Sequence, residues 1–232
     1  MNKKLMLLAA GVLTALAFSA LPGVASAGEY VNTCTINGVV AAECEGTVES
    51  TGNAILQDDS GGAAGRITCT KVSGTVKAAN KSSTFTMSLT ATGCTSNGFS
   101  CNSTGQPAGT MTTGNLIGHI VNLEPAPNKV PGALVTGVNV TLSCAGGLVK
   151  KTVTGNLIGE SETVECGVFK THSTANLEAG VGGGQKWVQV TTAGATTDLT
   201  INNDAGGAYT TAALLGTAHI NAKAGQTVAV DC

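Results

Sequence analysis

Apolar and polar residues alternate along several short stretches of the chain, which is the pattern of a β-strand with one buried face. The clearest case is residues 83–91, where threonines and serines separate the apolar positions Phe85, Met87, Leu89 and Ala91. Residues 137–144 repeat the pattern with Val138, Val140, Leu142 and Cys144. Residues 227–232 do so with Val228, Val230 and Cys232. We therefore expect three half-buried strands with these side chains turned inward.

Further stretches rich in β-branched residues are also expected to be strands. They are residues 66–76, 119–124, 150–159, 186–192 and 197–202. Clusters of Gly, Asn, Asp, Pro and Ser separate them and supply turns. Many short strands at close spacing predict an all-β fold, either an antiparallel β-sandwich or a barrel-like form of it. Only residues 207–220 have the composition of a helix, and Gly216 and the threonines weaken that interpretation.

One short sequence occurs twice. TTGNLIG at residues 112–118 recurs as VTGNLIG at residues 153–159. Each copy follows a strand, a cysteine and a turn, so the repeated unit is a hairpin. Two copies are too few for a solenoid, which needs at least about three stacked repeats. We interpret them as two similar hairpins in one sheet system. The alternative is that a Gly- and Thr-rich chain uses the same turn sequence twice.

The first 27 residues have the three parts of a secretory signal peptide. A short basic start, MNKK, precedes an apolar run, and the stretch ends in Ala25-Ser26-Ala27. The apolar run ends at a proline and small residues, so cleavage before Gly28 is expected instead of a membrane anchor. We expect a product that is released to the extracellular space, with no membrane span after cleavage.

Removal of 27 residues from the 232 of the chain leaves residues 28–232, a secreted β-rich region of 205 residues. This length suits one large domain, or two packed β units with a weak boundary near the glycine-rich stretch 175–185. Without Lys3 and Lys4, ten basic residues face fourteen acidic ones, which gives a net charge of −4. Nucleic acid is not an expected partner, because Arg66 is the only arginine and a binder needs a basic patch.

All the cysteines follow the leader, and we expect structural disulfides because their number is even and the extracellular compartment is oxidising. They are Cys34, Cys44, Cys69, Cys94, Cys101, Cys144, Cys166 and Cys232. The natural local pairs are Cys34/Cys44 and Cys94/Cys101, although the sequence does not choose among the many possible pairings. Zinc sites usually contain close pairs such as Cys-x-x-Cys, which the chain lacks, so no metal or other cofactor is expected.

Residues 57–65, QDDSGGAAG, contain the Asp-Ser-Gly-Gly sequence that surrounds the nucleophile of trypsin-like proteases. Those enzymes carry their catalytic residues in the order His, Asp, Ser. In this chain Ser60 precedes every histidine; these are His119, His172 and His219. We therefore interpret the motif as a turn and assign no catalytic residue. A permuted triad of Ser60 with His219 and either Asp231 or Asp204 is the alternative.

Carboxylates occur in close pairs, and a glycosidase places two carboxyl groups across a cleft. The pairs are Glu43/Glu45, Asp58/Asp59 and Glu160/Glu162. Glycosidase clefts also stack sugars on aromatic rings, which are scarce after the leader, so solvated strand faces are the preferred interpretation. Residues 57–62 and 202–207 hold oxygen donors for calcium, but neither matches the twelve-residue calcium loop, and plain turns are preferred.

Several short motifs together carry a resemblance. They are ALPGVASA at the end of the leader, the strand-and-cysteine units TATGC and TLSC, and the segments GQPAGTMTTGNLIGHIVNLE and LEAGVGGGQ. With these motifs the chain resembles a group of small secreted proteins of high-GC Gram-positive bacteria that are generally described as hypothetical. The resemblance implies a secreted β-rich product and no reaction, and it transfers no active-site residue.

Low charge, abundant Thr and Gly, alternating strands and the lack of a coherent catalytic set favour one class of function. This is a secreted, non-enzymatic structural or binding protein at or near the cell surface, with a cell-surface or matrix partner. One alternative is a secreted hydrolase built on Ser60 or a glutamate pair. Another is a subunit of an extracellular fibre, which needs an unpaired edge strand or a loose arm, such as residues 28–38, to join a neighbour's sheet.

Overall fold

The fold is antiparallel and built from strands, as the sequence predicts. A computed structural model describes residues 30–58, 66–124, 130–162, 164–180, 184–186, 198–202 and 208–231. Sixteen strands and one 3-10 turn, η2 (Ala145–Gly147), lie within this part of the chain. The expected signal peptide, residues 1–27, and its cleavage before Gly28 lie outside the described residues.

The strands follow one another closely along the chain. They are β1 (Val31–Ile36), β2 (Val39–Val40), β3 (Glu43–Ser50), β4 (Ala54–Asp58), β5 (Ile67–Cys69), β6 (Lys71–Ala79), β7 (Thr84–Thr92), β8 (Thr95–Ser96), β9 (Phe99–Ser103), β10 (Met111–Asn122), β11 (Pro131–Cys144), β12 (Val149–Ser161), β13 (His172–Leu177), β14 (Thr200–Asn202), β15 (Tyr209–Ala222) and β16 (Gln226–Asp231).

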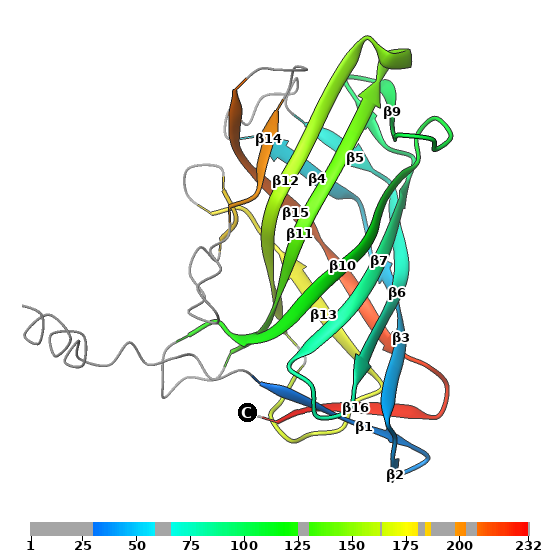
Figure 1. Cartoon of the computed structure of the whole chain (residues 1–232), viewed down its shortest axis with the longest axis vertical. Coiled ribbons are helices and arrows are strands. Elements are labelled where there is room, and N and C mark those ends of the chain that lie inside the picture. Colours follow the sequence, from blue (N-terminus) through cyan, green and yellow to red (C-terminus); the bar gives the residue numbers. More distant parts are fainter. Residues whose placement is uncertain are drawn as a thin grey trace, which may run out of the picture.

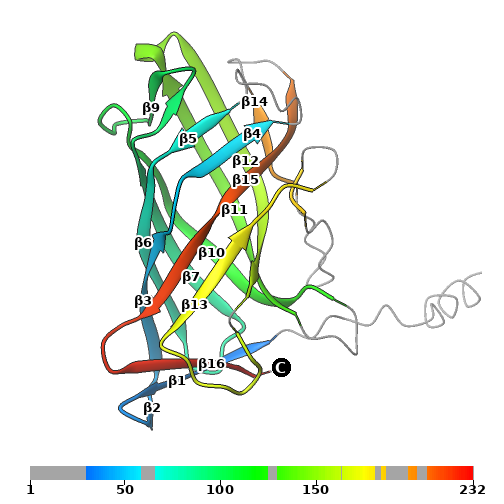
Figure 2. The same ribbon diagram turned by 180° about the vertical axis from the view of Figure 1, so that it is seen from behind.

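Thirteen of these strands form one sheet that closes on itself. Its order is β13-β12-β14-β15-β3-β6-β7-β10-β11-β9-β8-β5-β4, with additional pairings β13–β15, β12–β11 and β15–β4. Through these pairings the strands β3, β6, β7, β10, β11, β12, β13 and β15 follow one another around a closed ring (Figures 1 and 2). Because successive side chains of a strand point to opposite faces, every second residue of the ring points into its interior.

A second, three-stranded sheet of order β16-β1-β2 lies across the lower end of the ring in Figures 1 and 2. A disulfide between Cys34 and Cys44 joins β1 to β3. The backbone N–H of Asn32 donates to the carbonyl oxygen of Ser82 at 3.0 Å, which ties β1 to the turn between β6 and β7. Most of the arm proposed from residues 28–38 is therefore held within its own molecule.

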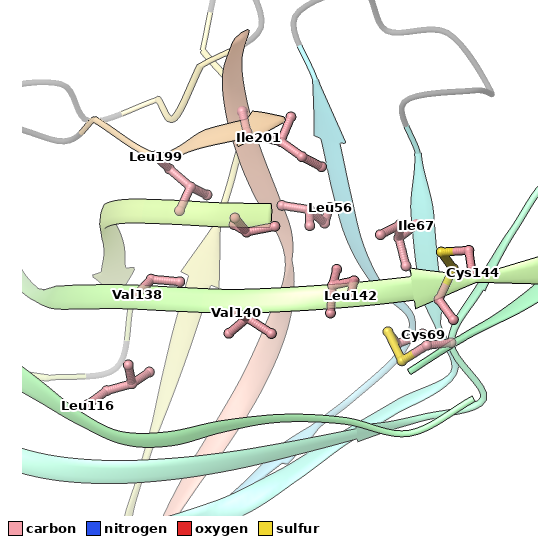
Figure 3. Close-up of a cluster of buried hydrophobic side chains, with 14 of the residues drawn as sticks. Leu56, Ile67, Cys69, Leu116, Val138, Val140, Leu142, Cys144, Leu199 and Ile201 are labelled. Carbon is pink, nitrogen blue, oxygen red and sulfur yellow. A yellow bond between two sulfur atoms is a disulfide. The ribbon is translucent and has the colours of Figure 1, made fainter. Parts of the chain in front are cut away.

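The largest hydrophobic cluster fills the opposite half of the ring (Figure 3). Its fully buried members come from distant strands: Ile67 of β5, Leu142 of β11 and Ile201 of β14. Of the inward residues predicted for 83–91 and 137–144, all but Leu89 belong to this cluster or pack against it, and Leu89 lines a cavity within it. The predicted faces of β7 and β11 are thus confirmed.

Two expected elements differ from the structure. Residues 66–76 form two strands, β5 and β6, which separate at Thr70, where the backbone N–H donates to Thr92 O at 3.0 Å. Residues 207–220, the one helix candidate, are mostly strand β15. Strand β15 pairs with β3, β4, β13 and β14, and these ladder hydrogen bonds outweigh a weak local preference for helix. Most of the strand expected at 186–192 lies outside the described residues.

The two copies of the repeated sequence lie on β10 and β12, which both pair with β11. Each copy contains a glycine with positive φ, Gly114 at 67° and Gly155 at 119°. The ladders beside both glycines shift register. After each shift the leucine of the motif, Leu116 or Leu157, turns into the ring. The copies are therefore equivalent in structure as well as in sequence.

The pairing expected between Cys34 and Cys44 is confirmed. Cys166 is also disulfide-bonded, and none of the described cysteines is free. Cys232 lies outside the described residues. The sheet crosses the weak boundary expected near 175–185, because β13 pairs both with β12 before it and with β15 after it.

The pairing expected between Cys94 and Cys101 is wrong. Cys94 is bonded to Cys69, and Cys101 is bonded to Cys144. The two cysteines are neighbours in the backbone, since Cys101 N–H donates to Cys94 O at 2.9 Å. Cys101, however, lies directly opposite Cys144 in the β9–β11 ladder, and this facing position decides the bond. Closeness in sequence therefore identified two cysteines that lie near each other in the structure but are bonded to other cysteines.

Candidate ligand-binding site

The interior of the ring is not filled at its lower end. A cavity of about 170 Å³, here called the lower cavity, lies between the ring wall and strand β16. Many of its wall positions are Gly or Ala: Gly46, Ala78, Gly132, Ala133, Gly159, Ala175 and Ala222. The larger apolar side chains around it include Phe85, Ile120, Ile220 and Val228. Small residues at inward positions leave this space, because protein interiors are otherwise close-packed.

A second cavity, the upper cavity, has a volume of about 120 Å³ and lies within the large hydrophobic cluster. Its lining includes Leu89, Leu116, Val140 and Leu157. These four residues come from β7, β10, β11 and β12, strands that also contribute to the lower cavity. Cavities with such apolar walls stay dry when empty and accept apolar guests.

Phe85 on β7 lies opposite Gly118 on β10. A Cβ atom at Gly118 would overlap the ring of Phe85, so the ring occupies the place of the missing side chain. Phe85 lines the lower cavity and also packs against the hydrophobic cluster that surrounds the upper one. It therefore lies between the two spaces.

Four charged or titratable residues border the lower cavity. They are Glu45, Glu160, Lys170 and His172. Glu160 faces Lys186 with an N–O distance of 3.7 Å, and Lys170 faces Glu165 at 3.1 Å. Each of these carboxylates therefore has a basic partner. Lys170, Thr171 and Ser173 form the polar rim of an otherwise largely apolar cavity, where Lys170 pairs with Val228 of β16.

Glu45 is the most strongly perturbed of these groups, and its side chain lies with Lys77 on the outer face of the ring, because the neighbouring Cys44 and Gly46 face inward. Its carboxylate accepts hydrogen bonds from Lys223 at 2.6 Å and from Lys77. These two partners lower the pKa of Glu45 to about 2. A general acid in a glycosidase needs a raised pKa, so the environment of Glu45 acts in the opposite direction.

A second polar cluster fixes the strands that cover the lower cavity. Asp231 on β16 accepts hydrogen bonds from Lys81 at 2.8 Å and from the hydroxyl of Thr33 on β1 at 2.6 Å. Both contacts lower the pKa of the Asp231 carboxyl. They join β1, β16 and the β6–β7 turn at the closed end of the ring.

The permuted triad is not assembled by the residues that the structure describes. Ser60 and Asp204 lie outside them. His219 is exposed on β15 opposite Thr174, and Asp231 is engaged with Lys81 and Thr33. The orienting hydrogen bond that a catalytic histidine needs at its second ring nitrogen is therefore not supplied to His219 by Asp231.

The other two histidines lie on different strands. His119, on β10, has a buried Nδ1 atom without a hydrogen-bond partner among the described residues. His172 begins β13, and its Nδ1 lies 3.5 Å from the hydroxyl of Thr171. Neither contact provides the carboxylate that orients a general base.

The remaining candidate sites fall partly outside the described chain. Of the pair Asp58/Asp59 and the loop 57–62, only Gln57 and Asp58 are described, and of the loop 202–207 only Asn202. Glu43 and Glu45 both face Lys77. Within the described ranges, no group of three or more His, Cys, Asp or Glu side chains is arranged to hold a metal ion.

The lower cavity is the feature that the sequence patterns did not reveal. The signal for it was present in the alternation itself, because several inward positions carry Gly or Ala where β11 carries Val and Leu. Ala78, Gly118 and Gly159 are three such positions. Small residues on one strand are unremarkable, and only ring closure brings those of many strands to one place.

No protein-family model matches this sequence, and no match was found among curated proteins or among solved structures. No helix in the described part of the chain is long and apolar enough to cross a membrane. The interpretation of the site therefore rests on its own geometry.

Proposed function

We propose that the protein is a secreted, non-enzymatic binding protein that holds a small apolar molecule inside its ring and works at or near the cell surface. The observation that carries the proposal is the lower cavity of about 170 Å³, with its apolar wall and polar rim. An engineered cavity of about 150 Å³ lined by apolar side chains binds benzene or xenon. The lower cavity therefore has a suitable size and polarity for one small apolar molecule.

Secretion is supported by two features. The first 27 residues have the pattern of a signal peptide. The disulfides Cys34–Cys44, Cys69–Cys94 and Cys101–Cys144 are the kind of bond that persists in oxidising compartments. The resemblance to small secreted proteins implies the same location.

The two alternatives have less support in the described residues. A hydrolase that used Glu45 as a general acid would need a raised pKa, and the lysines around Glu45 lower it. A fibre subunit that donated its first strand would have to release β1 from β16 and from the Cys34–Cys44 bond. Binding in the cavity requires neither change.

The test is a titration of the full mature chain, with its disulfides formed, by benzene as the probe. Binding is followed by methyl NMR, and the Ile120 and Ile220 signals, whose side chains line the lower cavity, should shift and saturate. Ala78→Leu should remove the saturable shift, because Ala78 lines the cavity. Ala79→Leu is the matched control, because the side chain of Ala79, the next residue in the sequence, is exposed.

The proposal fails if benzene gives no saturable shift with the wild-type protein. It also fails if Ala78→Leu and Ala79→Leu bind benzene equally well, because binding would then lie elsewhere. Thermal unfolding of both variants, followed by circular dichroism, shows that each is folded before it is titrated.

A further inference from the structure

The two cavities lie one behind the other along the same strands. On β7, Phe85 lines the lower cavity, and Leu89, four residues further along, lines the upper one. On β10, which runs antiparallel, Ile120 lines the lower cavity and Leu116 the upper one. A strand advances about 3.3 Å per residue, so the cavities are stacked in the direction of the strands. The interior is therefore elongated and not a single rounded space.

Side chains on β7 and β10 lie between the two cavities. Phe85 is one of them and lies opposite Gly118, with Met87 two positions further along β7. Phe85 carries the only phenyl, phenol or indole ring among the described residues that line either cavity. Several positions of the neighbouring wall of the lower cavity are Gly or Ala, which have little side chain to move or remove. Phe85 is thus the residue whose size fixes the inner end of the lower cavity.

The polarity of the interior gives a direction to a bound molecule. The polar lining residues Lys170 and Thr171 lie beside β16, where Lys170 pairs with Val228, whereas Phe85 packs against the apolar cluster. A guest with one polar end would place that end at the rim and its apolar end against Phe85. A space of about 170 Å³ corresponds to five or six groups of about 30 Å³, the volume of a water molecule and roughly that of a methylene.

We propose that the ligand is an unbranched aliphatic chain with a polar end group, and that Phe85 sets the chain length that the protein accepts. This inference rests on the proposed function. The lower cavity holds about six carbons, with the terminal methyl group against the ring of Phe85. Removal of the ring joins the lower and upper cavities into one longer site.

The experiment titrates a series of unbranched primary alcohols, from butanol to decanol, into the wild-type protein and Phe85→Ala. Each methylene that enters an apolar site should tighten binding by about fourfold. For the wild-type protein this gain should stop at about six carbons, where the chain meets Phe85. For Phe85→Ala it should continue for at least about two further carbons, because a large-to-small change leaves a cavity.

Phe99→Ala is the matched control, because Phe99 is 58% exposed on the hairpin of β8 and β9, away from both cavities. It should keep the wild-type limit at about six carbons. Phe85→Leu, a milder change, serves if Phe85→Ala does not fold, and it should move the limit in the same direction by a smaller amount. Circular dichroism melting curves establish which variants are folded.

The outcomes separate this inference from the proposed function. If no alcohol binds to the wild-type protein or to any folded variant, the proposed function fails and the inference fails with it. If the wild-type protein binds the short alcohols but the folded Phe85 variant keeps the same limit, only the inference fails. An affinity that rises through decanol in the wild-type protein also overturns the role of Phe85.

Discussion

Removal, one at a time, of three disulfides whose two cysteines are both described should destabilise the protein in an order set by the chain length that each one closes. The bonds Cys34–Cys44, Cys69–Cys94 and Cys101–Cys144 join residues 10, 25 and 43 positions apart. The chain-entropy relation then gives losses of about 2.7, 3.5 and 4.0 kcal/mol for the three double Cys→Ala variants. The difference between the shortest and the longest loop, about 1.3 kcal/mol, is large enough to measure.

The structure makes this comparison unusually well matched. The three loops follow one another along the chain without overlap, so removal of one bond leaves the other two loops unchanged. All six cysteines are at most 6% exposed, so the packing lost with each pair of sulfur atoms is similar. The differences among the variants should therefore report the denatured chain and not the native contacts.

The assay is equilibrium urea unfolding followed by circular dichroism, with the free energy of unfolding and the denaturant slope fitted for each variant. The slope should rise in every variant, because the denatured chain gains exposed surface when a cross-link is lost. The reasoning is refuted if the Cys34/Cys44 variant loses as much stability as the Cys101/Cys144 variant. Titration of free thiols before unfolding shows that the remaining bonds are intact.

Three further outcomes are expected. Gly74→Ala should destabilise the protein by about 1–3 kcal/mol in urea unfolding, because the new Cβ would overlap the backbone oxygen of Ser88. Gly52→Ala is the control and should leave the free energy of unfolding nearly unchanged, because no atom lies within 4 Å of its new Cβ. When the pH falls from 4.5 to about 2, Glu45→Gln should lose less stability than the wild-type protein. The lowered pKa of Glu45 stabilises the wild-type fold above this pH window, and that contribution disappears within it. Equal losses would contradict the role of the lysine partners of Glu45. Intact mass and non-reduced peptide mapping of secreted material should give a chain that begins at Gly28, with Cys69 linked to Cys94; a Cys94–Cys101 peptide would contradict the structure.

The alternation of apolar and polar residues was enough to predict the strands and their inward faces. Phe85 and Leu89 on β7, and Val140 and Leu142 on β11, point inward as their spacing requires. This prediction works because the direction of a side chain along a strand depends only on the local period of two. The pairing of Cys34 with Cys44 was predictable for a similar reason, since ten residues and one hairpin join them.

Contacts between distant segments decided the rest. The local composition of β15 suggested a helix, but four partner strands hold it extended. Thr33 meets Asp231 across 198 positions of sequence to hold the closed end of the ring. The cavity has the same origin, because each Gly or Ala is ordinary on its own strand and only the closed ring collects them around one space. The sequence by itself determined which face of each strand is apolar, and the tertiary structure decided where those faces meet and how much room they leave.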